Sequence, residues 1–205
     1  MKLFVANIIK QTYALGPGLR AVIWVQGCPF RCAGCIAPSW QVFKGGKQFD
    51  PEEVVRELVT ESVHGLTFSG GEPFSQAEAL AEVAYLARKK KPGLDIICFT
   101  GYRHKVLLQH PTNVGTPRLL SLLDVLIDGP YVRTLNDGIG LRGSSNQRII
   151  HLTDRMKGFT LEYGNRQMEM IIEEENLTFV GIPSPNINKA LSPFMETEGA
   201  HHERI

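Results

Sequence analysis

The chain has 205 residues and a formal net charge of +1, with 43% hydrophobic and 21% charged residues. This length and composition predict one globular domain of ordinary size, with enough apolar residues to form a core. The near-neutral charge, without a long basic block, argues against a nucleic acid or a membrane surface as partner, and no apolar run reaches membrane-spanning length.

The chain up to residue 152 alternates strand-like apolar runs with amphipathic segments. Residues 21–25 are typical of a buried strand, and they lead into a loop that holds three cysteines. Asp50 and Pro51 are typical of the start of a helix, with an apolar face over the residues up to 59. The further expected elements are strands at 65–69, 95–100, 124–127 and 147–152, and helices at 75–91, 103–109 and 117–123. This alternation predicts βα units and a parallel sheet within an α/β domain at residues 1–152.

Short polar or glycine-rich segments follow four of the predicted strands. They are the cysteine loop, Gly70-Gly71-Glu72-Pro73, Gly101-Tyr102 and Asp128-Gly129. Ligands of parallel α/β sheets bind beyond the carboxyl ends of the strands. We therefore expect these four segments to converge on one rim of the sheet.

The sequence pattern changes from Thr153 onward. Alternating residues at 159–163 and 167–172 flank Gly164-Asn165-Arg166, which predicts a β-hairpin. Residues 177–182 fit a third antiparallel strand. The stretch 184–205 is rich in Pro, Asn, Ser and Glu, which predicts a flexible tail after a small β-rich extension at 153–183.

Three of the four cysteines, Cys28, Cys32 and Cys35, lie within eight residues. A disulfide framework would spread its cysteines along the chain, and residues 1–10 lack the features of a signal peptide. The clustering therefore indicates metal or redox chemistry, and we expect the protein in a reducing cytoplasm.

Three thiolates on one short loop can hold three corners of an iron–sulfur cube. Protein [4Fe–4S] clusters usually take four thiolates, so three leave one iron open, and an open metal position is typical of a catalytic site. A structural zinc site or accidental clustering are the alternatives. Zinc would need a fourth Cys or His, and neither His64 nor Cys98 belongs to a second ligand pair. Cys98 lies in an apolar run and is expected to be a core residue.

The Cys-x3-Cys-x2-Cys motif and the Gly70-Gly71-Glu72-Pro73 motif, each after a predicted strand, together resemble the radical S-adenosylmethionine (SAM) superfamily. The resemblance implies a partial (β/α) barrel, a [4Fe–4S] cluster on the three cysteines, and SAM on the free iron. It also implies reductive cleavage of SAM to methionine and a 5′-deoxyadenosyl radical. Residues 70–73 would lie along the methionyl amino group. Glycines there permit close approach of the backbone, while Glu72 could accept a hydrogen bond from an ammonium or hold the loop.

A narrower resemblance covers roughly residues 10–152. Segments 31–40, 100–102, 124–130 and 141–148 resemble the activating proteins of anaerobic ribonucleoside-triphosphate reductase, which are close in kind to pyruvate formate-lyase activase. The resemblance implies a large glycyl-radical enzyme as partner and flavodoxin or ferredoxin as electron donor. Three features depart from the family: Gly34 where many members have an aromatic residue, Pro130 where some activases have Lys, and the long region after Asp154.

Five further positions match family segments that contact the cofactor or the docked substrate. Asp128 is placed like an acidic residue that helps to hold the cofactor, and otherwise serves as a turn residue before Gly129. Arg142, Asn146 and Arg148 could contact SAM or the glycine loop of the partner, or only fix their own loop. Tyr102 has two equally weighted alternatives, contact with the cofactor and packing within the protein.

Two other functions remain open from the sequence. The first is radical SAM chemistry on a small molecule, as in the similarly sized carboxy-deazaguanine synthases, which often need a Mg²⁺ site. The second is a non-enzymatic iron–sulfur module for electron transfer, which would need no SAM loop and would normally present a fourth thiolate.

Overall fold

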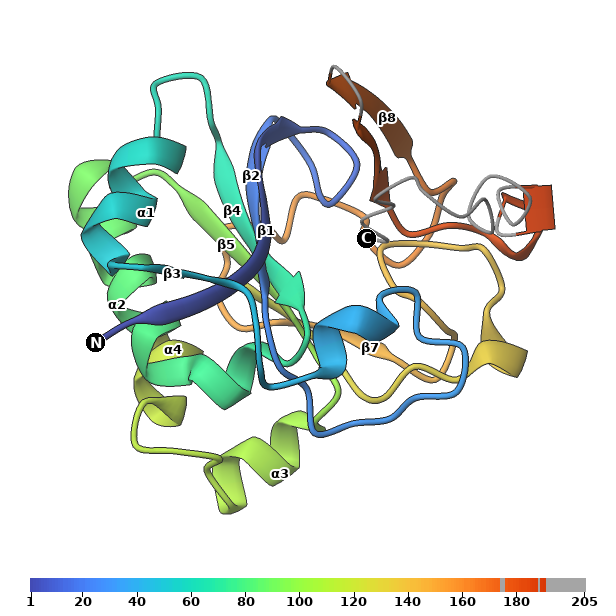
Figure 1. Ribbon diagram of the computed structural model, residues 1–205, viewed down its shortest axis with the longest axis horizontal. Helices are drawn as coiled ribbons and strands as arrows, with labels where there is room; N and C mark the ends of the chain where they lie inside the picture. The colour runs from blue at the N-terminus through green and yellow to red at the C-terminus, as the bar shows by residue number, and fades with distance from the viewer. Residues whose placement is uncertain (174–175, 188, 191–205) are drawn as a thin grey trace.

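The computed structural model describes residues 1–173, 176–187 and 189–190 (Figure 1). Most of the predicted flexible tail, from residue 191 onward, lies outside the described residues. A seven-stranded open sheet forms the centre, in the order β3-β1-β2-β4-β5-β6-β7. Its strands are β1 (Leu3–Thr12), β2 (Arg20–Val25), β3 (Lys47–Phe49), β4 (Gly65–Gly70), β5 (Asp95–Thr100), β6 (Val125–Asp128) and β7 (Arg148–His151).

The central strands β2, β4, β5 and β6 are parallel, as the alternating pattern predicts. The partial barrel is not confirmed, because the sheet is open and its outer strands are antiparallel. Only residues 13–19 separate β1 from β2, which is too short for a crossover helix. The long loop from β6 to β7 holds just one short 3-10 turn, Arg133–Leu135, so β7 also returns antiparallel. The sequence reasoning had not predicted β1 and β3.

The helices confirm the amphipathic patterns to within a few residues. They are α1 (Pro51–Leu58), α2 (Ala77–Lys90), α3 (His104–Gln109) and α4 (Thr116–Leu122), with a short 3-10 turn, Pro73–Gln76, before α2. Helix α1 begins after Asp50, whose backbone N–H donates to the Glu53 carboxylate at 3.0 Å. No helix within the described residues is long and apolar enough to cross a membrane.

Strand β2 is buried on both faces, and its alternate residues belong to two different apolar clusters. Ile23 packs in the large cluster that includes the buried faces of α1, α2 and α4, which lie together on one side of the sheet (Figure 1). Val22 and Trp24 face the opposite side, where Trp40 and Val180 belong to the same cluster. Loops and the C-terminal region therefore cover the face that the helices leave free.

The predicted hairpin between residues 159–163 and 167–172 is wrong. The observed pair is β8 (Met168–Glu173) with β9 (Asn176–Gly181), so the expected third strand is in fact the partner of the second. Residues 159–163 do not form a strand. Instead, Leu161 is buried against Met156 beside β6, and its carbonyl accepts a hydrogen bond from the N–H of Leu141 at 2.8 Å. Burial of this apolar side chain and pairing with a distant loop outweigh the local hairpin pattern.

Candidate functional site

A cavity of about 770 Å³ lies beyond the carboxyl ends of the parallel strands. Its lining includes the three clustered cysteines after β2, residues 70–73 after β4, Thr100 and Gly101 after β5, and Gly129 after β6. This volume is within the range of ligand-binding pockets. The four predicted segments thus meet at one site.

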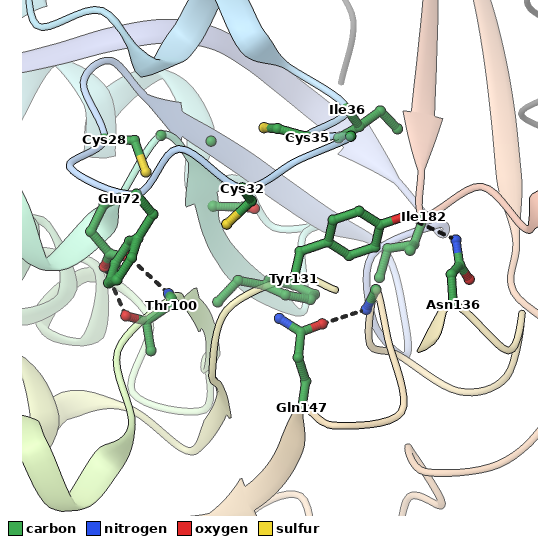
Figure 2. A pocket seen from close by; sticks show the side chains of 18 of the residues that line it. Cys28, Cys32, Cys35, Ile36, Glu72, Thr100, Tyr131, Asn136, Gln147 and Ile182 are labelled. Atoms are coloured by element: carbon green, nitrogen blue, oxygen red, sulfur yellow. Dashed lines mark hydrogen bonds between the residues drawn. The ribbon is translucent and has the colours of Figure 1, made fainter. Parts of the chain in front are cut away.

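The cysteine loop is held at its start and internally by backbone hydrogen bonds. The N–H of Gly27 donates to the carbonyl of Trp40 at 2.8 Å, and the N–H of Cys28 donates to the carbonyl of Gln41 at 3.1 Å. The N–H of Cys35 donates to the carbonyl of Cys32 at 3.1 Å. Figure 2 shows Cys28 beside Glu72, Cys32 near the middle of the view and Cys35 beside Ile36, and all three line the cavity. Residues that are next to one another in the sequence are therefore folded so that their thiols share one space.

Burial raises the pKa of Cys28 to about 12 and also raises the pKa of Cys32. Without metal, these two thiols keep their protons at neutral pH. Iron binds thiolates, so binding of the cluster must release these protons.

Three thiols on one loop are a donor set that an iron–sulfur cluster takes, because each thiolate binds a different iron. Among the described residues, no group of three His, Cys, Asp or Glu side chains is placed to hold a single metal ion. Cys98 is fully buried in β5 and is absent from the cavity lining, which confirms it as a core residue.

Gly70 and Gly71 lie where a side chain would meet backbone. Gly70 has a φ of 102°, and a Cβ there would overlap the N of Val25. A Cβ on Gly71 would overlap the carbonyl of Gly27, at the start of the cysteine loop. Glycine therefore allows the loop after β4 to lie directly against the loop after β2.

Glu72 is buried and accepts three hydrogen bonds from its own protein. Its carboxylate accepts hydrogen bonds from the N–H of Phe74 at 2.9 Å and from the N–H of Gly101 at 2.8 Å. It also accepts one from the hydroxyl of Thr100 at 2.8 Å (Figure 2). Burial raises the pKa of Glu72 to about 7, although these three donors favour the charged form. Of the two roles expected for Glu72, the contacts present are those that hold the loop.

Asp128 is fully buried at the end of β6 and is bonded by three groups of the protein. The guanidinium of Arg148 donates to both of its oxygens, Arg103 lies at 3.4 Å, and the N–H of His104 donates at 2.7 Å. Burial raises the pKa of Asp128, but the bonds from Arg148 and His104 bring it below its usual value. The carboxylate is therefore charged and joins the ends of β6, α3 and β7.

The other residues that the family resemblance pointed to interact with other parts of the protein. Arg142 pairs with Asp137 at 3.0 Å, and the Asn146 amide donates to the carbonyl of Pro130 at 2.8 Å. The rings of Tyr102 and Phe30 form a T-shaped pair, with centroids 4.7 Å apart. None of these three residues, nor Asp128 or Arg148, is among the described residues that line the cavity. Contact of these five residues with SAM or substrate stays a prediction.

The structure adds lining residues that the sequence reasoning missed. Gln147 donates to the carbonyl of Gly129 at 2.8 Å and accepts from the N–H of Gly143 at 2.7 Å, so it holds two lining loops together. Thr100, the residue before Gly101-Tyr102, could have been found from its place at the end of a predicted strand. Residues Gly181, Ile182, Pro183, Pro185 and Lys189 also line the cavity, and no sequence motif pointed to them.

Comparison with known proteins gives a consistent assignment. Residues 14–150 match the family described as a 4Fe-4S single cluster domain. The chain is 34% identical over 145 residues to the anaerobic ribonucleoside-triphosphate reductase-activating protein of Salmonella typhi. This alignment spans 67% of this chain and 91% of that protein. The protein of the same name from Escherichia coli K12 is 32% identical over 146 residues, with the same shares. The pyruvate formate-lyase-activating enzyme of Clostridium pasteurianum is 37% identical over 81 residues, which is 37% of this chain and 34% of that enzyme.

The matched region contains all three clustered cysteines and residues 70–73. The chain therefore belongs to the radical SAM family of activating proteins, enzymes that use a [4Fe–4S] cluster and SAM.

Proposed function

We propose that this protein reductively cleaves SAM to a 5′-deoxyadenosyl radical and thereby installs a glycyl radical in a partner enzyme, an anaerobic ribonucleoside-triphosphate reductase. The observation that carries the proposal is that the clustered cysteines and the Gly70-Gly71-Glu72 loop line one cavity in a chain of this family. The names of the relatives from Salmonella typhi and Escherichia coli support the reductase as partner.

The proposal assigns a separate task to each lining loop. Cys28, Cys32 and Cys35 would hold the cluster at three corners. When bound and reduced, the cluster supplies the single electron that cleavage of SAM requires. Gly70 and Gly71 would lie along the methionyl end of SAM. A side chain at Gly70 would meet the backbone of β2, and one at Gly71 would meet the backbone of Gly27, so glycine keeps this loop in its place beside the cysteines.

The apolar part of the lining would protect a radical from water and from solvent hydrogen donors. Trp24, Phe30 and Phe99 line the cavity together with Ile36. Such a wall excludes side reactions, which is the principal demand that radical chemistry makes on a protein. The electron source in the proposal is a small reduced protein, flavodoxin or ferredoxin.

The test is anaerobic mixing of the reconstituted protein with a reductant, SAM and an anaerobic ribonucleoside-triphosphate reductase. The expected result is a glycine-centred doublet in the EPR spectrum. Formation of deoxyadenosine without this doublet would reject the reductase as partner. A metabolite that accelerated deoxyadenosine release would favour the small-molecule alternative. A cluster EPR signal that SAM left unchanged would favour the electron-transfer alternative.

A further inference from the structure

Part of the cavity wall comes from chain that lies beyond the region shared with the family. The family match ends at residue 150, whereas Gly181, Ile182, Pro183 and Pro185 line the cavity. The alignment with the Salmonella typhi relative takes in 91% of that protein but only 67% of this chain, so this chain is longer. The C-terminal region therefore adds to the site a wall that the shared part of the family does not provide.

This wall is fixed to the rest of the site by Arg166. Its guanidinium is almost fully buried, with 3% of the side chain exposed. It donates to the carbonyl of Pro183 at 3.1 Å and to Oδ1 of Asn136 at 2.7 Å. Asn136 itself lines the cavity, and its amide also faces the carbonyl of Pro183 at 3.4 Å. The segment after β9 is thereby joined to the loop between β6 and β7.

The core also holds the segment in place. Val180, at the end of β9, is fully buried in the cluster that contains Trp24 of β2 and Trp40. Ile36 and Ile182 pack against the same cluster while lining the cavity. Residues 181–185 are therefore a built part of the wall, because both an apolar cluster and a buried guanidinium determine their position.

The cavity has two ends of different chemistry. Figure 2 shows Glu72 and Thr100 at one end, near Cys28, and Asn136 and Ile182 at the other. Under the proposed function, the methionyl part of SAM occupies the end with Cys28 and Glu72, next to the cluster. The opposite end is left for the substrate.

Residues 181–185 give the cavity an apolar wall that can pack against a peptide. Lys189 of the same region and Arg133 also line the cavity. Residues Gly181, Ile182, Pro183 and Pro185 bring apolar atoms and no side-chain hydrogen-bond donor, and the two prolines have no N–H. The nearby guanidinium of Arg166 is already bonded to Pro183 and Asn136. An uncharged segment of main chain with small side chains matches such a wall.

We infer that residues 181–185 form the binding wall for the glycine-bearing peptide segment of the partner enzyme, and that Ile182 is its specificity-determining contact. The inference rests on the proposed function and deepens it, because it names the part of this chain that recognises the substrate. The C-terminal region thus adapts a shared radical site to one partner.

The experiment measures the initial rate of glycyl-radical formation by EPR against the concentration of the reductase, at saturating SAM. Ile182→Ala removes three methylene-sized groups and is expected to raise KM for the reductase by about fiftyfold. Ile182→Val removes one methylene-sized group and disturbs the packing less. It is expected to raise KM for the reductase about threefold to fourfold. KM for SAM is expected to stay within about twofold of the parent for both variants.

The matched control is Ile172→Ala, because Ile172 lies on β8 of the same region with 70% of its surface exposed. It is expected to keep both KM values of the parent. An unchanged KM for the reductase in both Ile182 variants would overturn the inference, and so would a rise confined to KM for SAM. Failure of the proposed function is distinguishable, because the unaltered protein would then form no glycyl radical at all.

Discussion

The hydroxyl of Thr100 donates a hydrogen bond to Oε1 of Glu72 at 2.8 Å (Figure 2). Both side chains are buried, and the bond joins the end of β5 to the loop after β4. The same carboxyl group also accepts the N–H groups of Phe74 and Gly101. One buried acidic side chain therefore organises two of the loops that line the cavity.

Replacing Thr100 with valine is expected to lower the free energy of unfolding by about 1–3 kcal/mol, measured by urea denaturation. The substitution removes a donor from Glu72 and the acceptor of the Tyr102 N–H, which lies at 3.1 Å. Thr60→Val is the control, since the Thr60 hydroxyl shares a hydrogen bond with Ser62 at an exposed position, and it should change stability by less than about 0.5 kcal/mol. Equal effects of the two variants would contradict this account of Glu72.

The pKa of Glu72 predicts a dependence of stability on pH. Burial raises this pKa to about 7, from 4.5 in the unfolded chain, so the folded state favours the protonated carboxyl group. The stability that protonation contributes is fully present below pH 4.5 and is lost as pH rises through about 7. Glu72→Gln carries no titrating group. Without cofactors, the stability of the parent relative to this variant should therefore fall by about 3 kcal/mol across that range. Parallel unfolding curves at every pH would show that Glu72 does not titrate there.

Gly71→Ala is expected to destabilise the protein by more than about 2 kcal/mol, or to abolish SAM cleavage if it folds. The added Cβ would meet the backbone of Gly27 and the carbonyl of Trp40, so the two loops would have to separate. Gly93→Ala provides the control, because no atom lies within 4 Å of a Cβ placed there. Thermal unfolding and deoxyadenosine release measure both variants. A Gly71→Ala protein indistinguishable from Gly93→Ala would disprove the close approach of the loops.

Single replacements of Cys28, Cys32 or Cys35 by alanine should each lose the iron content and the SAM cleavage of the parent after anaerobic reconstitution. Two thiolates cannot hold three corners of the cluster. Cys98→Ala tests the specificity of this loss, since the Cys98 thiol is buried in β5 away from the cavity lining. It should keep the iron content of the parent while losing some stability. Iron retained in all three loop variants would refute the assigned ligands.

Much of the fold and of the cofactor end of the site follows from patterns within a few residues of chain. The apolar run at 95–100 and the Asp50-Pro51 helix start predict β5 and α1, because strand and helix periodicities are local properties. The cysteine motif likewise lies on one loop. Parallel strands place such loops at one edge of the sheet, so their convergence was predictable as well.

The tertiary structure decided whatever depends on contacts between distant residues. Leu161 is drawn into the core beside β6, and this moves the hairpin to β8 and β9. Asp128 is bonded by Arg148 and Arg103, which are distant from it in the sequence. Ile182 reaches the cavity of Cys35 only because Arg166 and Val180 hold its segment there. The amino-acid sequence determined the chemistry of the site, since the three clustered cysteines are neighbours in the chain. Packing determined the substrate wall, since its free energy comes from burial and hydrogen bonds between segments that no local pattern connects.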